Sequence, residues 1–202
     1  PIYGLVGIGL VHPQQVKRNN LAQAGDVLIL SKPLGVGMLS AALKKGTLDA
    51  AGYADMLRWT TLLNTPGIAL SALPAVHAMT DVTGFGLAGH LLEICRGSSL
   101  SARLQWDAVP LIPLAAAIAQ SGTATGASQR NWDGYGSSVE LPAGCAAWQQ
   151  NLLTDPQTSG GLLIACAPDA AAQVLAILQQ QGFDQAALIG SLRQGLPGIV
   201  VA

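Results

Sequence analysis

Apolar residues recur along this chain at two spacings, which separate its expected helices from its expected strands. Apolar positions three or four residues apart predict helices at 36–45, 47–64, 66–73, 85–95, 110–120, within 141–153, and at 168–181. Short apolar or alternating runs predict strands at 2–12, 26–31, 75–79, 100–106, 161–165, 187–191 and 198–201. Residues 121–138 are polar and glycine-rich, and they are expected to form the longest loop. Because strands and helices are mixed without regular alternation, the pattern favours an α+β fold.

Composition narrows the classes of protein that fit this pattern. Half of the 202 residues are hydrophobic and only 10% are charged, which allows a sizeable core. The net charge of −1 and the lack of a Lys/Arg cluster argue against nucleic acid as a main partner. No apolar run reaches the roughly 18 residues that a membrane span needs, so no membrane partner is expected. The three cysteines are widely spaced among apolar neighbours, which favours buried thiols in a reducing, cytoplasmic compartment.

The stretch 79–93 carries polar residues between an apolar run and a helical pattern. Thr83 is expected to cap the helix, and Gly84 would let a ligand approach the backbone closely. Free amides at a helix start attract anions, whereas Asp81 would repel a phosphate unless a cation lay between them. Mg²⁺ suits that position, since it takes one or two carboxylates together with phosphate oxygens. The alternative is that Asp81 only caps the helix.

Two further segments contain polar residues and glycines ahead of regular structure. Lys32 precedes a Pro-Leu-Gly turn and a helix start, where it could either reach a phosphate or lie on the surface as an ordinary lysine. The loop 155–161 offers the hydroxyls of Thr158 and Ser159, which could hold substrate oxygens. The same loop composition is also what a simple turn requires.

The chain resembles the selenophosphate synthetase (selenide, water dikinase) family. The resemblance rests on Asp81–Leu87 with Gly89–Leu91, on a second block at 155–163, on 31–35 and on the opening residues 1–5, and it runs nearly the whole length. It implies the C-terminal domain fold of the aminoimidazole ribonucleotide synthetase superfamily, which is a mixed β-sheet packed by helices. It also implies a homodimeric enzyme that uses Mg²⁺ and converts ATP, selenide and water into selenophosphate, AMP and phosphate.

The resemblance also implies how the parts of such an enzyme are divided. The reactive Cys or selenocysteine, a catalytic Lys and further Mg²⁺-binding Asp residues of the family belong to an N-terminal domain, so no catalytic residue is expected here. Residues 1–16 are expected to be a strand and linker from that domain, and 17–202 the C-terminal domain. The strand at 2–12, without its sheet, is expected to mediate contacts between chains. The chain alone is expected to be inactive.

The polar motifs and the family resemblance together predict one site. The family carries a Gly-Gly-Thr-x-Arg-Asn run where this chain has Thr125–Asn131, so an Arg-Asn pair is retained without the glycine pair. Asp81 is the expected metal ligand. The expected nucleotide-binding residues are Thr83, Gly84, Lys32, Arg130, Thr158 and Ser159. The alternatives are another ATP-dependent member of the superfamily and a domain that only packs against a partner.

Overall fold

A seven-stranded mixed β-sheet forms the centre of the computed structural model, which describes residues 4, 6 and 8–202. Its strands lie in the order β2-β5-β1-β6-β3-β7-β4. Neighbours from β2 to β3 are antiparallel, whereas β3-β7 and β7-β4 are parallel. This arrangement confirms the α+β class. The strands are β1 (Val27–Leu30), β2 (Val76–Asp81), β3 (Leu100–Leu104), β4 (Val139–Glu140), β5 (Leu162–Cys166), β6 (Ala187–Gln194) and β7 (Gly198–Val201).

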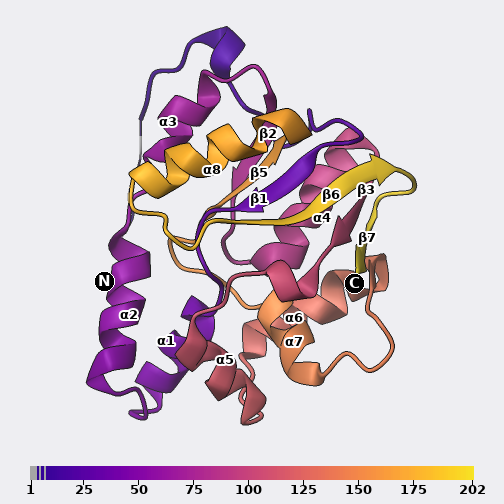
Figure 1. The fold of residues 1–202 in the computed structure, drawn as a ribbon. Helices are drawn as coiled ribbons and strands as arrows, with labels where there is room; N and C mark the ends of the chain where they lie inside the picture. Colours follow the sequence, from indigo (N-terminus) through magenta and orange to yellow (C-terminus); the bar gives the residue numbers. More distant parts are fainter. Residues whose placement is uncertain (1–3, 5, 7) are drawn as a thin grey trace.

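Helices cover both faces of this sheet and extend beyond one end of it (Figure 1). The α-helices are α1 (Val36–Lys44), α2 (Ala50–Thr61), α3 (Pro66–Ser71), α4 (Gly86–Ser98), α5 (Pro113–Gln120), α6 (Gly126–Tyr135), α7 (Ala147–Leu153) and α8 (Ala171–Gln180). Short 3₁₀ turns occupy Pro13–Gln15, Trp106–Ala108, Gly136–Ser138 and Pro168–Ala170. In the part of the chain that the structure describes, none of the helices combines the length and the apolarity needed to cross a bilayer.

The core is divided among three clusters of buried side chains. Alternate residues of β1 point to opposite faces, so Leu28 packs with α4 while Ile29 packs with α3 and α8. A third cluster joins α1, α2, α5 and α7 around Trp59. Cys95 and Cys166 are buried thiols in the first two clusters. Both faces of β1 and β5 are therefore covered, which explains why these strands are continuous apolar runs.

The prediction of a long loop at 121–138 is wrong, because α6 occupies most of it. The helix is stabilised by polar contacts. Thr125 Oγ1 accepts a hydrogen bond from the Ser128 amide at 3.1 Å, as an N-cap does. The Ser128 hydroxyl, fully buried, donates to the Asn151 carbonyl, and Asn131 donates to the Thr154 carbonyl at 2.9 Å. A helix that buries polar side chains gives no apolar periodicity, so the spacing of apolar residues could not reveal it.

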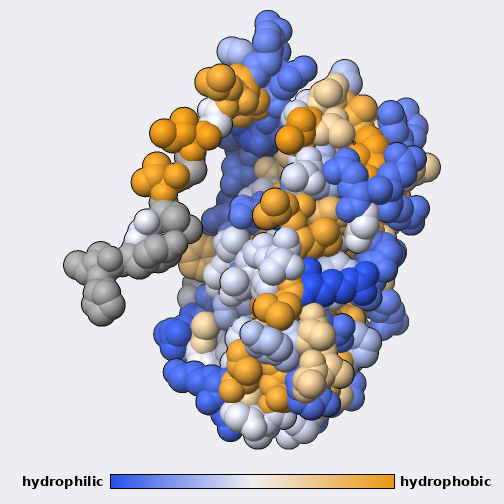
Figure 2. Space-filling model, turned by 90° about the vertical axis from the view of Figure 1, so that its left-hand side faces the viewer, coloured by the Kyte–Doolittle hydropathy of each residue, from blue (hydrophilic) through white to orange (hydrophobic). Residues whose placement is uncertain are grey.

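The prediction of a strand at 2–12 is wrong for the part of it that can be tested. Residues 4, 6 and 8–12 have no strand structure, and residues 1–3, 5 and 7 lie outside the described residues. Val6, Ile8 and Leu10 are almost fully exposed. In Figure 2, apolar side chains of this segment, coloured orange, stand away from the body of the molecule. A contact between chains through this segment stays a prediction.

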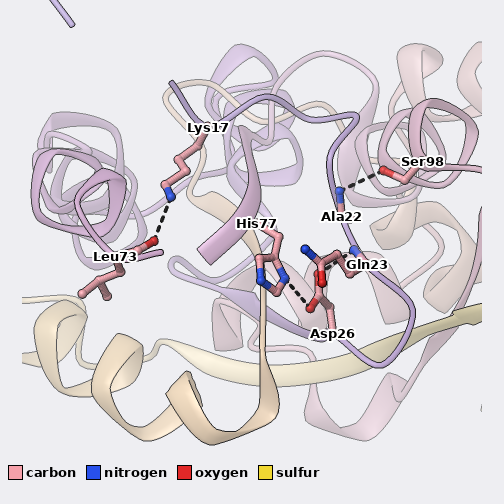
Figure 3. A network of polar contacts seen from close by, with 7 residues as sticks. All are labelled: Lys17, Ala22, Gln23, Asp26, Leu73, His77 and Ser98. Atoms are coloured by element: carbon pink, nitrogen blue, oxygen red, sulfur yellow. Dashed lines mark hydrogen bonds and ion pairs between the residues drawn. The ribbon is translucent and has the colours of Figure 1, made fainter. Parts of the chain in front are cut away.

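The segment before β1 is held across the sheet edge by polar contacts, which Figure 3 shows together. The Lys17 ammonium donates to a main-chain carbonyl after α3 at 2.8 Å, and the Ala22 amide donates to a hydroxyl of α4 at 3.1 Å. Asp26 lies at the end of the segment, with one oxygen 2.7 Å from His77 Nδ1 and the other accepting from the Gln23 amide at 2.8 Å. Because Asp26 is only 2% exposed, these partners replace its lost water.

We expect Asp26→Ala to lower the free energy of unfolding by about 2–3 kcal/mol, since it removes two contacts of a buried charged group. Urea denaturation measures the change. Asp107→Ala is the matched control, because Asp107 is an exposed carboxylate on the surface. Equal small losses in the two variants would show that the contacts of Asp26 do not hold the segment.

Candidate functional site

Asp81 is the last residue of the edge strand β2, and its side chain is exposed. No donor within the described ranges forms a hydrogen bond with its carboxylate. The strand is held at this point by the next residue, because the Val82 amide donates to the Gly161 carbonyl at 2.9 Å. The helix after it begins only at Gly86, with no side chain as cap. The alternative that Asp81 caps this helix is therefore wrong, and its carboxylate oxygens face solvent.

Thr83 is not the helix cap either, which corrects the prediction. Its Oγ1 lies 3.0 Å from Nε2 of His90, one turn inside α4, and Nδ1 of His90 lies 2.9 Å from the Glu93 carboxylate. His90 is only 7% exposed. The chain turns into the helix through Gly86, which has φ +70° and whose Cβ position lies 2.7 Å from the carbonyl carbon of Thr154. A residue without a Cβ is required there, and Thr83 is free to pair with the imidazole.

The loop 155–161 interlocks with the turn that follows Asp81. The Gln157 amide donates to the Thr83 carbonyl at 3.0 Å. The Cβ position of Gly160 lies 2.0 Å from the Val82 carbonyl oxygen, so only glycine permits this approach. The structure thus brings the two blocks together, with the exposed residues Thr158 and Ser159 on one loop and exposed Gly84 on the other.

Lys32 lies beneath this loop, where it is 1% exposed, so the alternative of an ordinary surface lysine is wrong. Its ammonium donates to the carbonyls of Trp59, Leu62 and Ser159 at 3.2, 2.6 and 2.7 Å. The first two are the free carbonyls at the end of α2, where a cation is favourable. Burial lowers the pKa of Lys32 to about 8. All three N–H groups are engaged by main chain, so Lys32 supports Ser159 from below and has no N–H left for a phosphate.

The amides at the start of α1 are satisfied by the same loop. Gln157 Oε1 accepts from the amides of Gly35 and Val36 at 3.1 and 3.2 Å, and the Asp155 carboxylate accepts from the Met38 amide at 3.3 Å. Asp155 is completely buried, and one of its oxygens has no partner among the described groups. The internal carboxylate occupies the place where an external anion would otherwise bind. Its burial raises its pKa to about 7.

Arg130 lies on α6, where it lines a cavity between α4 and α6. Its neighbour Asn131 donates to the carbonyl of Gly84 at 2.9 Å, and so ties α6 to the turn after Asp81. Periodicity did not identify Asn131, Gln157 or Asp155 as structural partners, because these contacts join distant segments. The spacing of His90 and Glu93 on one helix was a usable signal, since residues three apart share a face.

A divalent cation would find one suitable ligand in this arrangement. The exposed carboxylate of Asp81 offers the hard oxygens that Mg²⁺ takes together with phosphate oxygens and water. Within residues 4, 6 and 8–202, no cluster of three or more His, Cys, Asp or Glu could hold a metal ion. Asp81 could therefore serve as a single ligand, and the described residues form no cluster that would hold the ion by themselves.

Comparisons with known proteins identify relatives of this chain. Residues 23–200 match the family model of the AIR synthase related protein, C-terminal domain. The selenide, water dikinase of Paraburkholderia xenovorans is 60% identical over 195 residues, covering 96% of this chain and 55% of that protein. Those of Burkholderia ambifaria and Rhizobium meliloti are 58% and 50% identical, covering 100% of this chain and 57% and 58% of their own lengths. The chain spans a little over half the length of these curated relatives.

Solved structures share the fold at low sequence identity. Thiamine-monophosphate kinase from Stenotrophomonas maltophilia superposes with a TM-score of 0.67 at 22% identity, covering 95% of this chain and 54% of that one. E. coli HypE gives 0.68 at 22%, covering 92% and 49%. At this identity the likeness concerns the fold alone.

Asp155 provides a test of the buried loop through pH. Because its folded-state pKa of about 7 lies above the ordinary 3.8, the folded chain binds this proton more tightly than the unfolded chain does. The carboxyl therefore stabilises the fold at low pH, and this contribution is lost as the pH rises from about 4 to about 7. The free energy of unfolding of the native chain minus that of Asp155→Asn should therefore fall by on the order of 2–4 kcal/mol as the pH rises between those limits.

Denaturant titrations of the native chain and of Asp155→Asn across this pH range measure the difference between their free energies of unfolding. The effects of all other carboxyls cancel in this difference. Asp107→Asn, at an exposed position, should show no such trend. A difference between Asp155→Asn and the native chain that stays constant with pH would contradict the raised pKa.

Proposed function

The chain belongs to the family of AIR synthase related proteins, C-terminal domain. We propose that it is the C-terminal domain of a selenophosphate synthetase. Such an enzyme converts ATP, selenide and water into selenophosphate, AMP and phosphate, and relatives named selenide, water dikinase match the chain over its whole length. The observation that carries the proposal is the exposed carboxylate of Asp81, which has no donor among residues 4, 6 and 8–202 and lies beside two interlocked loops.

In this proposal, Asp81 would hold Mg²⁺, which would supply the neutralisation of phosphate charge that phosphoryl transfer requires. The role of the chain is to keep the carboxylate at a fixed point, and the bond between the Val82 amide and the Gly161 carbonyl fixes the end of β2. Because no donor in the described part of the chain engages the carboxylate, its charge is available to a cation.

The two loops supply polar groups around that point. Gly84 is exposed and has no Cβ, so an oxygen of the substrate can approach its main chain. Thr83, Thr158 and Ser159 bring hydroxyls to the same surface, and Lys32 holds the Ser159 carbonyl from below. Arg130 contributes a positive charge from α6. The exposed groups orient substrate, Lys32 only supports the loop, and none of these residues is assigned a bond-making step.

The remaining parts of the enzyme are proposed to lie outside this domain. Residues 1–16 then belong to a linker from an N-terminal ATP-binding domain, and 17–202 form the C-terminal domain. A reactive Cys or selenocysteine and the other metal ligands would come from that N-terminal domain. The whole enzyme is proposed to be a cytoplasmic homodimer, and this chain alone to be inactive.

The experiment is Asp81→Asn in the enzyme that includes the N-terminal domain. Asparagine keeps the size of the side chain but lacks the negative charge that holds a hard cation. Selenide-dependent formation of AMP should fall by about a hundredfold or more, equivalent to about 3 kcal/mol of transition-state stabilisation. Raising Mg²⁺ should restore part of the activity, whereas the free energy of unfolding should change by less than about 0.5 kcal/mol, as for a surface substitution.

Asp107→Asn removes an equally exposed charge elsewhere and should leave the rate unchanged. Near-normal activity of Asp81→Asn at ordinary Mg²⁺ would remove Asp81 from the site. Selenide-independent turnover by the native enzyme would point to another ATP-dependent member of the superfamily.

A further inference from the structure

The cavity between α4 and α6 has a volume of about 290 Å³ and a polar rim. Arg96 reaches it from α4 and Arg130 from α6. Neither guanidinium forms an ion pair with a carboxylate in the described part of the chain, and Arg96 has only a hydroxyl partner, Ser138 Oγ at 3.2 Å. The rim therefore presents two cations whose charges are not compensated by ion pairing.

One carboxylate also lines the cavity, and it has a partner inside the protein. The Glu93 carboxylate lies 2.9 Å from Nδ1 of His90, whose other ring nitrogen lies 3.0 Å from Thr83 Oγ1. The imidazole of His90 thereby holds the Glu93 carboxylate on the surface of α4. Two guanidinium groups against one engaged carboxylate leave the cavity positive, which favours an anion.

The walls are aromatic, and a glycine makes room for them. Phe85 and Tyr135 line the cavity, and Tyr135 donates its hydroxyl to the Phe85 carbonyl. The Cβ position of Gly89 lies 2.5 Å from Phe85 Cβ and 3.1 Å from Tyr135 Cε1, so a side chain there would displace both rings. Phe85 is 54% exposed although it is apolar. Aromatic surface of this kind suits a flat, apolar group of a ligand.

We propose that this cavity binds a small organic phosphate, namely a single planar ring that carries a phosphate group. The phosphate accepts hydrogen bonds from Arg96 and Arg130, whose planar guanidinium groups match its oxygens. The ring packs against Phe85 and Tyr135. The volume lies at the lower end of the roughly 300–1,000 Å³ typical of ligand pockets, so one ring fits better than a whole nucleotide. The proposal needs neither Mg²⁺ nor ATP and does not use Asp81, although it shares Arg130 with the proposed substrate surface.

Phenyl phosphate is the probe, titrated into the 202-residue chain by calorimetry and followed by amide NMR shifts. We expect saturable binding with the largest shifts at the amides of Gly89 and Gly134, which line the cavity. Inorganic phosphate, which lacks the ring, and phenol, which lacks the charge, should each bind about tenfold more weakly or worse, because each keeps only one half of the recognition.

Arg96→Gln and Arg130→Gln should each weaken phenyl phosphate about tenfold, the effect of one charge-assisted hydrogen bond. Arg193→Gln, an exposed arginine on β6 outside the cavity, should have no effect. All three positions are exposed, so the variants should retain the fold, which circular dichroism checks. Absence of saturable binding, or equal affinity in all three variants, overturns the proposal. Inorganic phosphate binding as tightly as phenyl phosphate overturns the role of the aromatic walls.

Discussion

The buried ammonium of Lys32 connects the parts of this domain that would otherwise be separate layers. It donates hydrogen bonds to two carbonyls at the end of α2 and to the carbonyl of Ser159, on the loop that precedes β5. A lysine without these acceptors would be too costly to bury, so the ammonium and the loop conformation require one another. Ser159 itself has φ +50°, a backbone conformation that the surrounding contacts maintain. The helical layer, the sheet and the exposed loop are thereby joined at one point.

Two carboxylates near this point have opposite environments, and the contrast indicates different roles. Asp155 is buried against the start of α1 and accepts hydrogen bonds from the Met38 amide and from Gln157. Asp81 is exposed at the end of β2 and has no donor within the described residues. An internal carboxylate with its own donors organises the fold, whereas an exposed one without donors can bind a cation. Both carboxylates lie next to a glycine-containing loop, so hydrogen bonding is what distinguishes them.

The turn 82–85 is the place where the candidate metal site and the cavity meet. Its first residue is fixed by β5 through the Gly161 carbonyl, and its carbonyl at Gly84 accepts from Asn131 of α6. Phe85, at its end, forms one wall of the cavity. The hydroxyl of Thr83 leads through His90 to Glu93, at the cavity rim. A single short turn thus contacts the loop 155–161, helix α6 and the cavity.

The sequence by itself determined the elements that depend on local apolar spacing. The helix after Asp81, the strands around 26–31 and 161–165 and the α+β class are all present, because burial of an apolar stripe or run is a property of neighbouring residues. The apolar run 75–79 also predicted a strand ahead of Asp81, and the strand in the structure ends at Asp81. These features could be inferred without knowing which segments meet.

Only the tertiary structure decided where the polar groups find their partners. Lys32 meets a carbonyl 127 positions away, and Gln157 satisfies amides 122 and 121 positions away at the start of α1. The helix at 126–135 exists because its Ser128 is buried against α7, although its sequence is polar. Thr83 bonds to an imidazole instead of capping the helix, since Gly86 turns the chain away from it. A hydrogen bond depends on distance in space, and for polar residues in loops the local sequence does not determine that distance.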